Sequence, residues 1–398
     1  MSVVSGPEVE MRPQLLVAPL AVLFMLLGMV IGVVRLLFFG DVTSQPFLPN
    51  LLPYHGEIMV FGFLAVLIVV ERYIGALPFK LNRSVHYMPP LVALGAVLKI
   101  AGLLWSLQAV NIVGSVVLAM GLTVYVYLLW AVGRYSAQPL PMRFMMLGGL
   151  LLLITALVTV DRPAVGNLSL TLLMLSFPVF TILGERIELS RFLATAVHAR
   201  ARWGLGLAVL ASALLLLDLK FPAAVPDSAF ALWALLVAAL VVPLFWAERP
   251  LMRGELSVGL SRYLGRHLVV AYLWLMLGLA LIVVLAVVGQ DRPLFDASTH
   301  SIAVGFVFTM IMAHAPVIAP ALLGRGVVVA RLSYYPLVLL TLGNLLRVGG
   351  YGLEEAGVRV GAVVGVSGLV VLLAIVAFTV MMVRALFASQ EQVVDKVV

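Results

Sequence analysis

Twelve long apolar stretches follow one another along the chain, separated by short segments rich in glycine, proline and charge. Each stretch holds the roughly 20 apolar residues that a helix needs to cross a bilayer, and turn-forming residues mark the boundaries. We therefore predict transmembrane helices at residues 14–39, 55–76, 87–108, 110–133, 142–160, 166–185, 203–222, 228–246, 264–289, 300–323, 332–352 and 360–385. The expected fold is an all-α polytopic bundle: a segment 1–13, one membrane domain 14–386 and a tail 387–398.

The composition agrees with this pattern. Hydrophobic residues make up 63% of the chain and charged residues 11%, which excludes a water-soluble globule. The net charge of +7 comes from lysines and arginines in short loops, so we expect lipid as a partner and no nucleic acid. Most of these residues lie at the chain ends and in the loops after even-numbered helices, which predicts cytoplasmic termini. Residues 1–13 lack the basic n-region and the small-residue cleavage site of a signal peptide, so we expect the first helix to be retained. We expect a multi-pass protein of a bacterial inner membrane.

The chain contains no cysteine, which narrows the chemistry open to it. Structural disulfides, iron–sulfur clusters, thiolate-ligated haem and covalent c-type haem are excluded. Any metal has to be bound by histidine, methionine, carboxylate or tyrosine.

Two predicted helices, the second and the tenth, begin with histidine at the outer surface. His55 opens one, and His300 opens the other. The predicted topology makes these helices parallel, so the two imidazoles start at one depth. We predict that they are the axial ligands of one b-type haem. Gly62, seven residues after His55, would leave that face open to the porphyrin. The alternative is two unrelated interfacial residues at helix starts.

A second histidine of the tenth helix, His314, lies fourteen residues after His300, on the same face and about 21 Å deeper. It could be the fifth ligand of a second, high-spin haem or a copper ligand, with Met310 and Met312 as soft thioethers. The alternative is a neutral histidine bonded to a carbonyl freed by a kink at Pro316 and Pro320. The remaining histidines are expected to be solvated or to face headgroups: His86, His198 and His267.

A few charges fall inside the predicted helices, where they need partners or water. Glu57 and Lys99 are expected to form an ion pair, either structural or part of a proton route from the outside; a snorkelling Lys99 is a further alternative. Arg347 is placed to bind a haem propionate at the outer side. Arg162 and Arg292 are candidates for the same role, in Asp-Arg-Pro turns that could equally be helix-end punctuation. A cluster at the cytoplasmic end of the sixth helix is predicted to form a surface salt-bridge network, with contact to the inner loops as the alternative: Glu185, Arg186, Glu188 and Arg191.

Short motifs in three helices resemble a known family. They are Tyr-His-Gly-Glu-Ile-Met-Val-Phe-Gly-Phe at 54–63, His300 followed by Gly305 and Met310, and Gly-Glu-Arg at 184–186. These are similar to motifs of the NnrS family, membrane proteins that contain haem and copper and are associated with nitric oxide. In that family helix 2 opens with His-Ala-His-Glu-Met-x-Phe-Gly-Phe. The chain resembles a divergent member, since Glu57 stands where the family has its second histidine and the family pattern does not include His314-Ala-Pro.

The resemblance implies a haem b site, a possible copper, and a role in nitric oxide metabolism. More distantly, the chain resembles subunit I of haem–copper oxidases, which has twelve helices and haem-ligating histidines on helices 2 and 10. That enzyme uses more intramembrane histidines than this chain has, so a standard oxygen-reducing centre is excluded. Val69 stands fourteen residues after His55, so helix 2 cannot complete a second histidine pair as in cytochrome b.

Three functions remain open at this point. The first is a haem protein, with oxidoreductase activity as one option, that binds or turns over a small gas such as nitric oxide or passes electrons from a donor such as quinol. The second is a twelve-helix secondary transporter, which would need interrupted helices at matching places in its two halves. The third is a non-catalytic membrane subunit that handles haem or copper.

Overall fold

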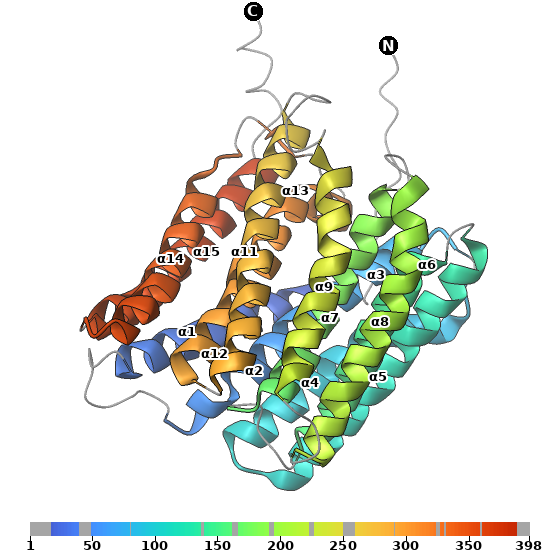
Figure 1. The fold of residues 1–398 in the computed structure, drawn as a ribbon. Coiled ribbons are helices and arrows are strands. Elements are labelled where there is room, and N and C mark those ends of the chain that lie inside the picture. Colours follow the sequence, from blue (N-terminus) through green and yellow to red (C-terminus); the bar gives the residue numbers. More distant parts are fainter. Residues whose placement is uncertain are drawn as a thin grey trace, which may run out of the picture.

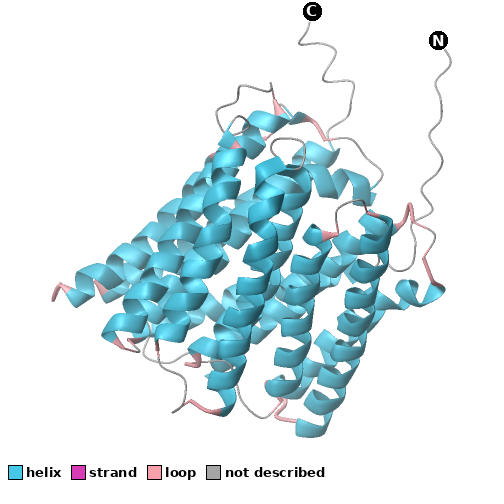
Figure 2. Ribbon diagram, turned by 45° about the vertical axis from the view of Figure 1, so that its right-hand side comes forward, coloured by secondary structure: helices cyan, strands magenta, loops and turns pink. Residues whose placement is uncertain are grey.

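The computed structural model describes most of the chain, with gaps in the loops and at both ends. The described residues are 17–39, 49–79, 81–136, 139–160, 166–190, 195–222, 227–249, 259–289, 291–323, 327–329, 332–358 and 360–387. Within them the secondary structure is helical, without strands (Figure 2). Twelve helices in these residues are long and apolar enough to cross a membrane. The prediction of an all-α polytopic bundle is confirmed.

Ten of the crossings are single helices. They are α1 (Ala18–Phe39), α4 (Met88–Leu104), α5 (Gln108–Tyr135), α6 (Leu140–Val158), α7 (Leu168–Ser190), α8 (Thr195–Lys220), α9 (Ser228–Ala247), α11 (Leu260–Val288), α14 (Tyr335–Glu355) and α15 (Gly361–Phe387). A 3₁₀ turn, η4 (Arg83–Tyr87), precedes α4.

The other two crossings, the second and the tenth, are composite. The second consists of η2 (Pro49–Tyr54), α2 (His55–Glu57), the π-helical η3 (Ile58–Leu64) and α3 (Ala65–Ala76). The tenth consists of α12 (Arg292–His300), the π-helical η5 (Ser301–Phe308) and α13 (Thr309–Leu323). Each therefore carries a π-helical segment that begins within three residues of its histidine.

The tenth helix begins earlier than its hydropathy predicts. Asp291 caps its first turn, because the side-chain Oδ2 accepts a hydrogen bond of 2.8 Å from the backbone N–H of Leu294, and Pro293 fits the first turn. The expectation that His300 opens this helix is thus wrong: the residue lies two turns inside it. The polar first turn, Arg-Pro-Leu-Phe-Asp, had hidden the true start.

The second, sixth and tenth crossings form the centre of the bundle. In the most apolar part of α7, 94% of the residues are buried inside the bundle, against 67% in the second crossing and 61% in the tenth, while in an outer helix such as α8 only 28% are buried. In Figure 1, α14 and α15 lie at one side of the bundle and α5, α6 and α8 at the other. The histidine-bearing helices are therefore shielded from lipid by their neighbours.

Glycines allow helices to approach closely where this core is built. A Cβ at Gly95 would collide with the backbone of Leu118, so α4 and α5 pack in direct backbone contact. On η5, a Cβ at Gly305 would collide with Trp274 of α11. Gly305 is thus explained by the packing of the tenth helix against α11.

Candidate functional site

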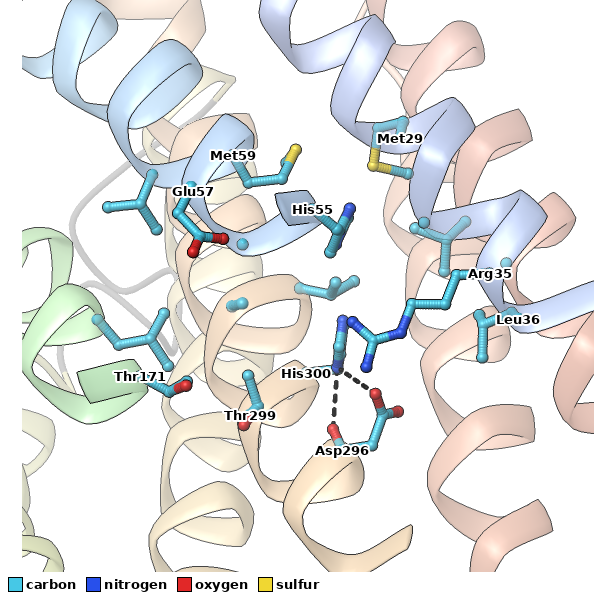
Figure 3. A pocket seen from close by; sticks show the side chains of 18 of the residues that line it. Met29, Arg35, Leu36, His55, Glu57, Met59, Thr171, Asp296, Thr299 and His300 are labelled. Carbon is cyan, nitrogen blue, oxygen red and sulfur yellow. Dashed lines mark hydrogen bonds and ion pairs between the residues drawn. The ribbon is translucent and has the colours of Figure 1, made fainter. Parts of the chain in front are cut away.

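A cavity separates the second helix from the tenth near the end of the bundle that is predicted to face outward. We call it the outer cavity. Its volume is about 140 Å³, and it is partly open to the surroundings. Its lining includes His55, His300, Arg35, Arg347 and Glu57, together with apolar side chains of α1, α7 and α15. Figure 3 shows the two imidazoles on facing sides of this space.

The rings of His55 and His300 are in register across the cavity. Their centres are 6.2 Å apart, and their planes differ by 17°. Two metal–imidazole bonds of about 2 Å each, with about 1 Å more from each nitrogen to its ring centre, require a separation of roughly 6 Å. The structure thus brings together the two predicted ligands at a distance that suits one shared metal.

Both imidazoles are held by the same kind of hydrogen bond. Nδ1 of His55 lies 2.8 Å from the carbonyl oxygen of Gly28 on α1, and Nδ1 of His300 lies 2.9 Å from that of Asp296. A carbonyl only accepts, so each Nδ1 carries the proton and each Nε2 keeps its lone pair. This is the tautomer in which histidine binds a metal, with the ring orientation fixed by the other nitrogen.

The π-helical segments next to the histidines change the local backbone hydrogen bonding. Such segments are rare and occur frequently at functional sites. Asn344 of α14 donates a hydrogen bond of 3.4 Å from its side-chain Nδ2 to the backbone oxygen of His300. An intramembrane amide thus satisfies a carbonyl at the start of η5, which explains why a polar residue is buried there.

A glycine of α1 makes room for the first imidazole. A Cβ at Gly32 would lie 2.6 Å from Cε1 of His55. The Gly62 prediction turned out differently: a Cβ there would lie 2.7 Å from Phe24 and 2.9 Å from Ile100. Gly62 packs against α1 and α4, and it is not among the residues that line the cavity. The α1 helix lies against the second helix on this face and occupies the space that helical periodicity left open.

Arg347, the arginine expected at the outer side, lines the cavity, but its guanidinium is bound to a carboxylate of the protein. Arg347 donates from Nε to Oδ2 of Asp296 at 2.6 Å and from Nη2 to Oδ1 at 2.9 Å. The Asp296 carboxylate also lies 3.4 Å from Nδ1 of His300 (Figure 3). The chain Arg347–Asp296–His300 therefore fixes the second imidazole. Arg35 on α1 lines the same space, and its charge interacts with that of Asp296.

The other predicted outer residues lie elsewhere. Arg292 is in the first turn of α12 and does not line the cavity, and Asp291 beside it caps the helix, as the punctuation alternative predicted. Arg162 lies outside the described residues.

Glu57 and Lys99 are both fully buried, and their charges interact. Glu57 lines the outer cavity. The Lys99 ammonium has acceptors of its own: Nζ donates to Oδ1 of Asn111 at 3.2 Å, to Oγ of Ser115 at 2.8 Å and to the backbone oxygen of Ala156 at 3.4 Å. Three acceptors satisfy its three N–H donors. Lys99 does not snorkel, and it ties α4 to α5 and α6.

His314 lies in a second, inner polar cluster. Its Nδ1 is 2.7 Å from the carbonyl oxygen of Met310, and its Nε2 is 3.3 Å from Nη1 of Arg186. The nitrogen that would bind a metal therefore accepts a hydrogen bond from a guanidinium. The imidazole is bonded to a carbonyl, as one alternative predicted, but that carbonyl is one helical turn back and not one that Pro316 frees.

Arg186 corrects the prediction of a surface salt-bridge network. It is 3% exposed, and its Nε donates to Oε1 of Glu248 at 2.7 Å. Tyr272 donates to the other oxygen of Glu248 at 2.8 Å. His267 was expected to be solvated, but it is fully buried, with Nδ1 2.8 Å from the backbone oxygen of Tyr263.

Of the other two histidines, His86 lies beside the Tyr73 hydroxyl at 2.6 Å. The side chain of His198 lies outside the described residues.

The outer cavity has the donor set that a bis-histidine haem requires. His55 and His300 both line it, two arginines line it as well, and the remaining lining is largely apolar. No group of three or more histidine, cysteine, aspartate or glutamate side chains gathers into a metal site in the described part of the chain. The site offers two imidazoles as metal ligands. This number suits the iron of a haem, whose porphyrin supplies the other donors, better than a copper ion that has only protein ligands.

Sequence reasoning missed Arg35, Asp296 and Gly32 as parts of the site. Asp296 stands four residues before His300, a spacing that places the two on one helix face, and this signal could have found it. Arg35 is the only charged residue among residues 18–39. Nothing in the sequence marks Gly32, whose role depends on which helix packs beside His55.

The model of a family described as Domain of unknown function (DUF8744) matches residues 14–384. The chain belongs to this family. No curated protein matches the chain.

Proposed function

We propose that this member of the DUF8744 family is a membrane haem protein, in which His55 and His300 are the axial ligands of one b-type haem. The observation that carries the proposal is the separation of 6.2 Å between nearly parallel imidazoles, each with Nδ1 bonded to a carbonyl. The resemblance of the motifs around these residues to those of the NnrS family supports the same assignment.

Electron transfer is the function that this site supports best. A haem with two histidine ligands supplies one-electron chemistry at an iron without an open coordination position. The protein's own residues hold the site in place: Gly28 and Asp296 orient the imidazoles, and Arg35 and Arg347 add positive charge to the cavity wall, where a haem would carry its propionates. Apolar walls limit water around the cofactor, which together with axial ligation sets its potential.

Small-gas chemistry, including that of nitric oxide, is a second role that the resemblance suggests. It needs a metal with a free position, and His314 was the candidate for such a second haem or for copper. Because Nε2 of His314 accepts from Arg186, we restrict the proposal to one haem, with nitric oxide as a redox partner and not as a resident ligand.

The transporter alternative receives no support from the helix interruptions. In the described residues, π-helical segments occur in the second and tenth crossings. These are the second helix of one six-helix half and the fourth of the other, which are not matching places.

Visible spectra of the purified protein, expressed with a haem supply, test the proposal. We expect a Soret band with sharp low-spin α and β bands in the reduced protein. In His55→Gly and His300→Gly these low-spin bands are expected to disappear, and added imidazole should restore them if the variants remain folded. The control, His86→Ala, removes a histidine outside the cavity and should leave the spectrum unchanged. A protein without a Soret band, or low-spin bands that persist in both variants, would refute the assignment.

A further inference from the structure

A second cavity lies on the inner side of the first, between α3, α7 and α13. We call it the inner cavity. Its volume is about 130 Å³, it is partly open to the surroundings, and it is lined mainly by aliphatic side chains, including Leu67, Ile68, Ile311 and Ile318. Leu64 lines both cavities, so they are separated by little more than a layer of side chains. The stacked rings of Phe63 and Phe308, with centres 5.4 Å apart, join the second crossing to the tenth.

Four polar side chains interrupt this apolar lining: Glu71, Thr181, Glu185 and His314. Their composition limits the ligand. An apolar cavity with a few polar groups is typical of small-molecule sites, but the aliphatic walls do not suit a sugar or a nucleotide. An isolated metal ion does not fit either, since the described residues contain no cluster of three histidine, cysteine or acidic ligands.

The charges around the inner cavity favour a ligand that donates hydrogen bonds. Arg72 forms an ion pair with Glu185 and lies 3.5 Å from Glu71, while Arg186 pairs with Glu248. These ion pairs of the described residues bring two guanidinium groups against three carboxylates. Arg72 is closer to Glu185 than to Glu71, so the negative charge of Glu71 is the least compensated by a cation. The Glu71 side chain is 23% exposed, and a half-buried carboxylate in that position gains from an O–H or N–H donor.

His314 is a fixed element of this wall. With Nδ1 on a carbonyl and Nε2 on Arg186, the ring is oriented on both sides. The open hydrogen-bonding capacity of the cavity therefore lies with the carboxylate of Glu71 and the hydroxyl of Thr181. Both can accept a hydrogen bond from a ligand.

We propose that the inner cavity binds the headgroup of a membrane quinol, with a hydroxyl of the quinol donating to the Glu71 carboxylate. A hydroquinone combines a flat apolar ring with two O–H donors and dissolves in the bilayer, which matches the lining. The inference deepens the proposed function, on which it rests for its biological meaning, because a quinol carries electrons that a haem in the outer cavity would exchange.

Calorimetric titration with 2-heptyl-4-hydroxyquinoline N-oxide, a hydroxyl-bearing quinol analogue, tests the site in the purified full-length protein. We expect one molecule bound per chain. Glu71→Gln should weaken binding about tenfold, the effect of losing one hydrogen bond. Leu67→Trp should abolish binding by filling the cavity without changing its charge. The control is Glu188→Gln, on the same helix as Glu185 and outside the lining, and should bind like the unmodified protein.

The same samples separate this inference from the proposed function. The quinol site is overturned if the unmodified protein does not bind the analogue, or if Glu71→Gln and Leu67→Trp both bind it as tightly as the unmodified protein does. Haem bands present in every variant would leave the proposed function standing. Binding that is lost in both variants supports the quinol site even if no Soret band is found, in which case the haem assignment alone fails.

Discussion

Arg347 of α14 holds the carboxylate of Asp296 on α12 through two hydrogen bonds, 2.6 and 2.9 Å long. The same carboxylate lies 3.4 Å from Nδ1 of His300, so a residue of α14 helps to fix the orientation of an imidazole on α12. Arginine matches a carboxylate with two parallel donors, which gives the contact its geometric specificity.

Removal of this arginine should destabilise the protein. Arg347→Gln leaves the Asp296 carboxylate without its cation, and we expect a loss of about 2–3 kcal/mol, because a partly exposed pair is worth less than a fully buried one. Unfolding in a detergent titration measures the loss. The double variant Asp296→Asn/Arg347→Gln should lose less than the sum of the two single variants. Additive losses would show that the pair is not coupled.

A side chain at Gly32 should disturb the site without disturbing the fold. A Cβ there would lie 2.6 Å from Cε1 of His55, so Gly32→Ala must displace the imidazole. We expect a lower haem content and weaker low-spin bands at nearly unchanged thermal stability. Gly75→Ala, where a Cβ meets nothing within 4 Å, is the matched control. Equal haem spectra in both variants would contradict this account of Gly32.

The buried pair of Arg186 and Glu248 should be sensitive to loss of one partner. Glu248 is fully buried, so Arg186→Met leaves an uncompensated charge and should cost about 3–5 kcal/mol in the free energy of unfolding. Arg186→Met/Glu248→Gln should recover much of that loss. Tyr272→Phe removes only one hydrogen bond to the carboxylate, and we expect a loss of about 1.5–3 kcal/mol. Thermal unfolding of the four proteins checks the order.

Two variants separate the contributions that the volume and the charge of the Lys99 side chain make to stability. Lys99→Ala leaves a cavity in a closely packed region between α4, α5 and α6, and we expect a loss of about 2–5 kcal/mol. Lys99→Met keeps most of the volume and removes a buried charge, so it should lose less. Denaturation midpoints of the two variants measure the difference. A Lys99→Met variant at least as unstable as Lys99→Ala would show that the three hydrogen bonds of the ammonium outweigh its packing.

The architecture could be predicted because the bilayer imposes it locally. Backbone groups in hydrocarbon must be hydrogen-bonded within their own segment, so an apolar run of sufficient length becomes a helix wherever it stands in the chain. The start of the tenth helix was predicted wrongly because hydropathy is a weak signal at a polar helix end. The polar first turn of α12 has low hydropathy, and its helix start depends on the Asp291 cap.

The candidate site was only partly predictable. His55 and His300 could be selected because ionisable residues are rare in a membrane and the topology placed them at one end. Glycine 62 was assigned from the periodicity of a single helix, and the neighbours Phe24 and Ile100 changed that assignment. Burial of Arg186 and His267 was missed because a position near a helix end in sequence does not reveal which helices cover it.

The sequence by itself thus determined the twelve membrane-crossing helices and the two histidines that could share a metal, since hydrophobic length and residue chemistry are local properties. Only the tertiary structure decided that α1 packs beside His55, that Arg347 binds Asp296, and that Arg186 reaches His314. These contacts join residues 27 to 128 positions apart, and they depend on how the helices pack against one another, which periodicity within one helix does not specify.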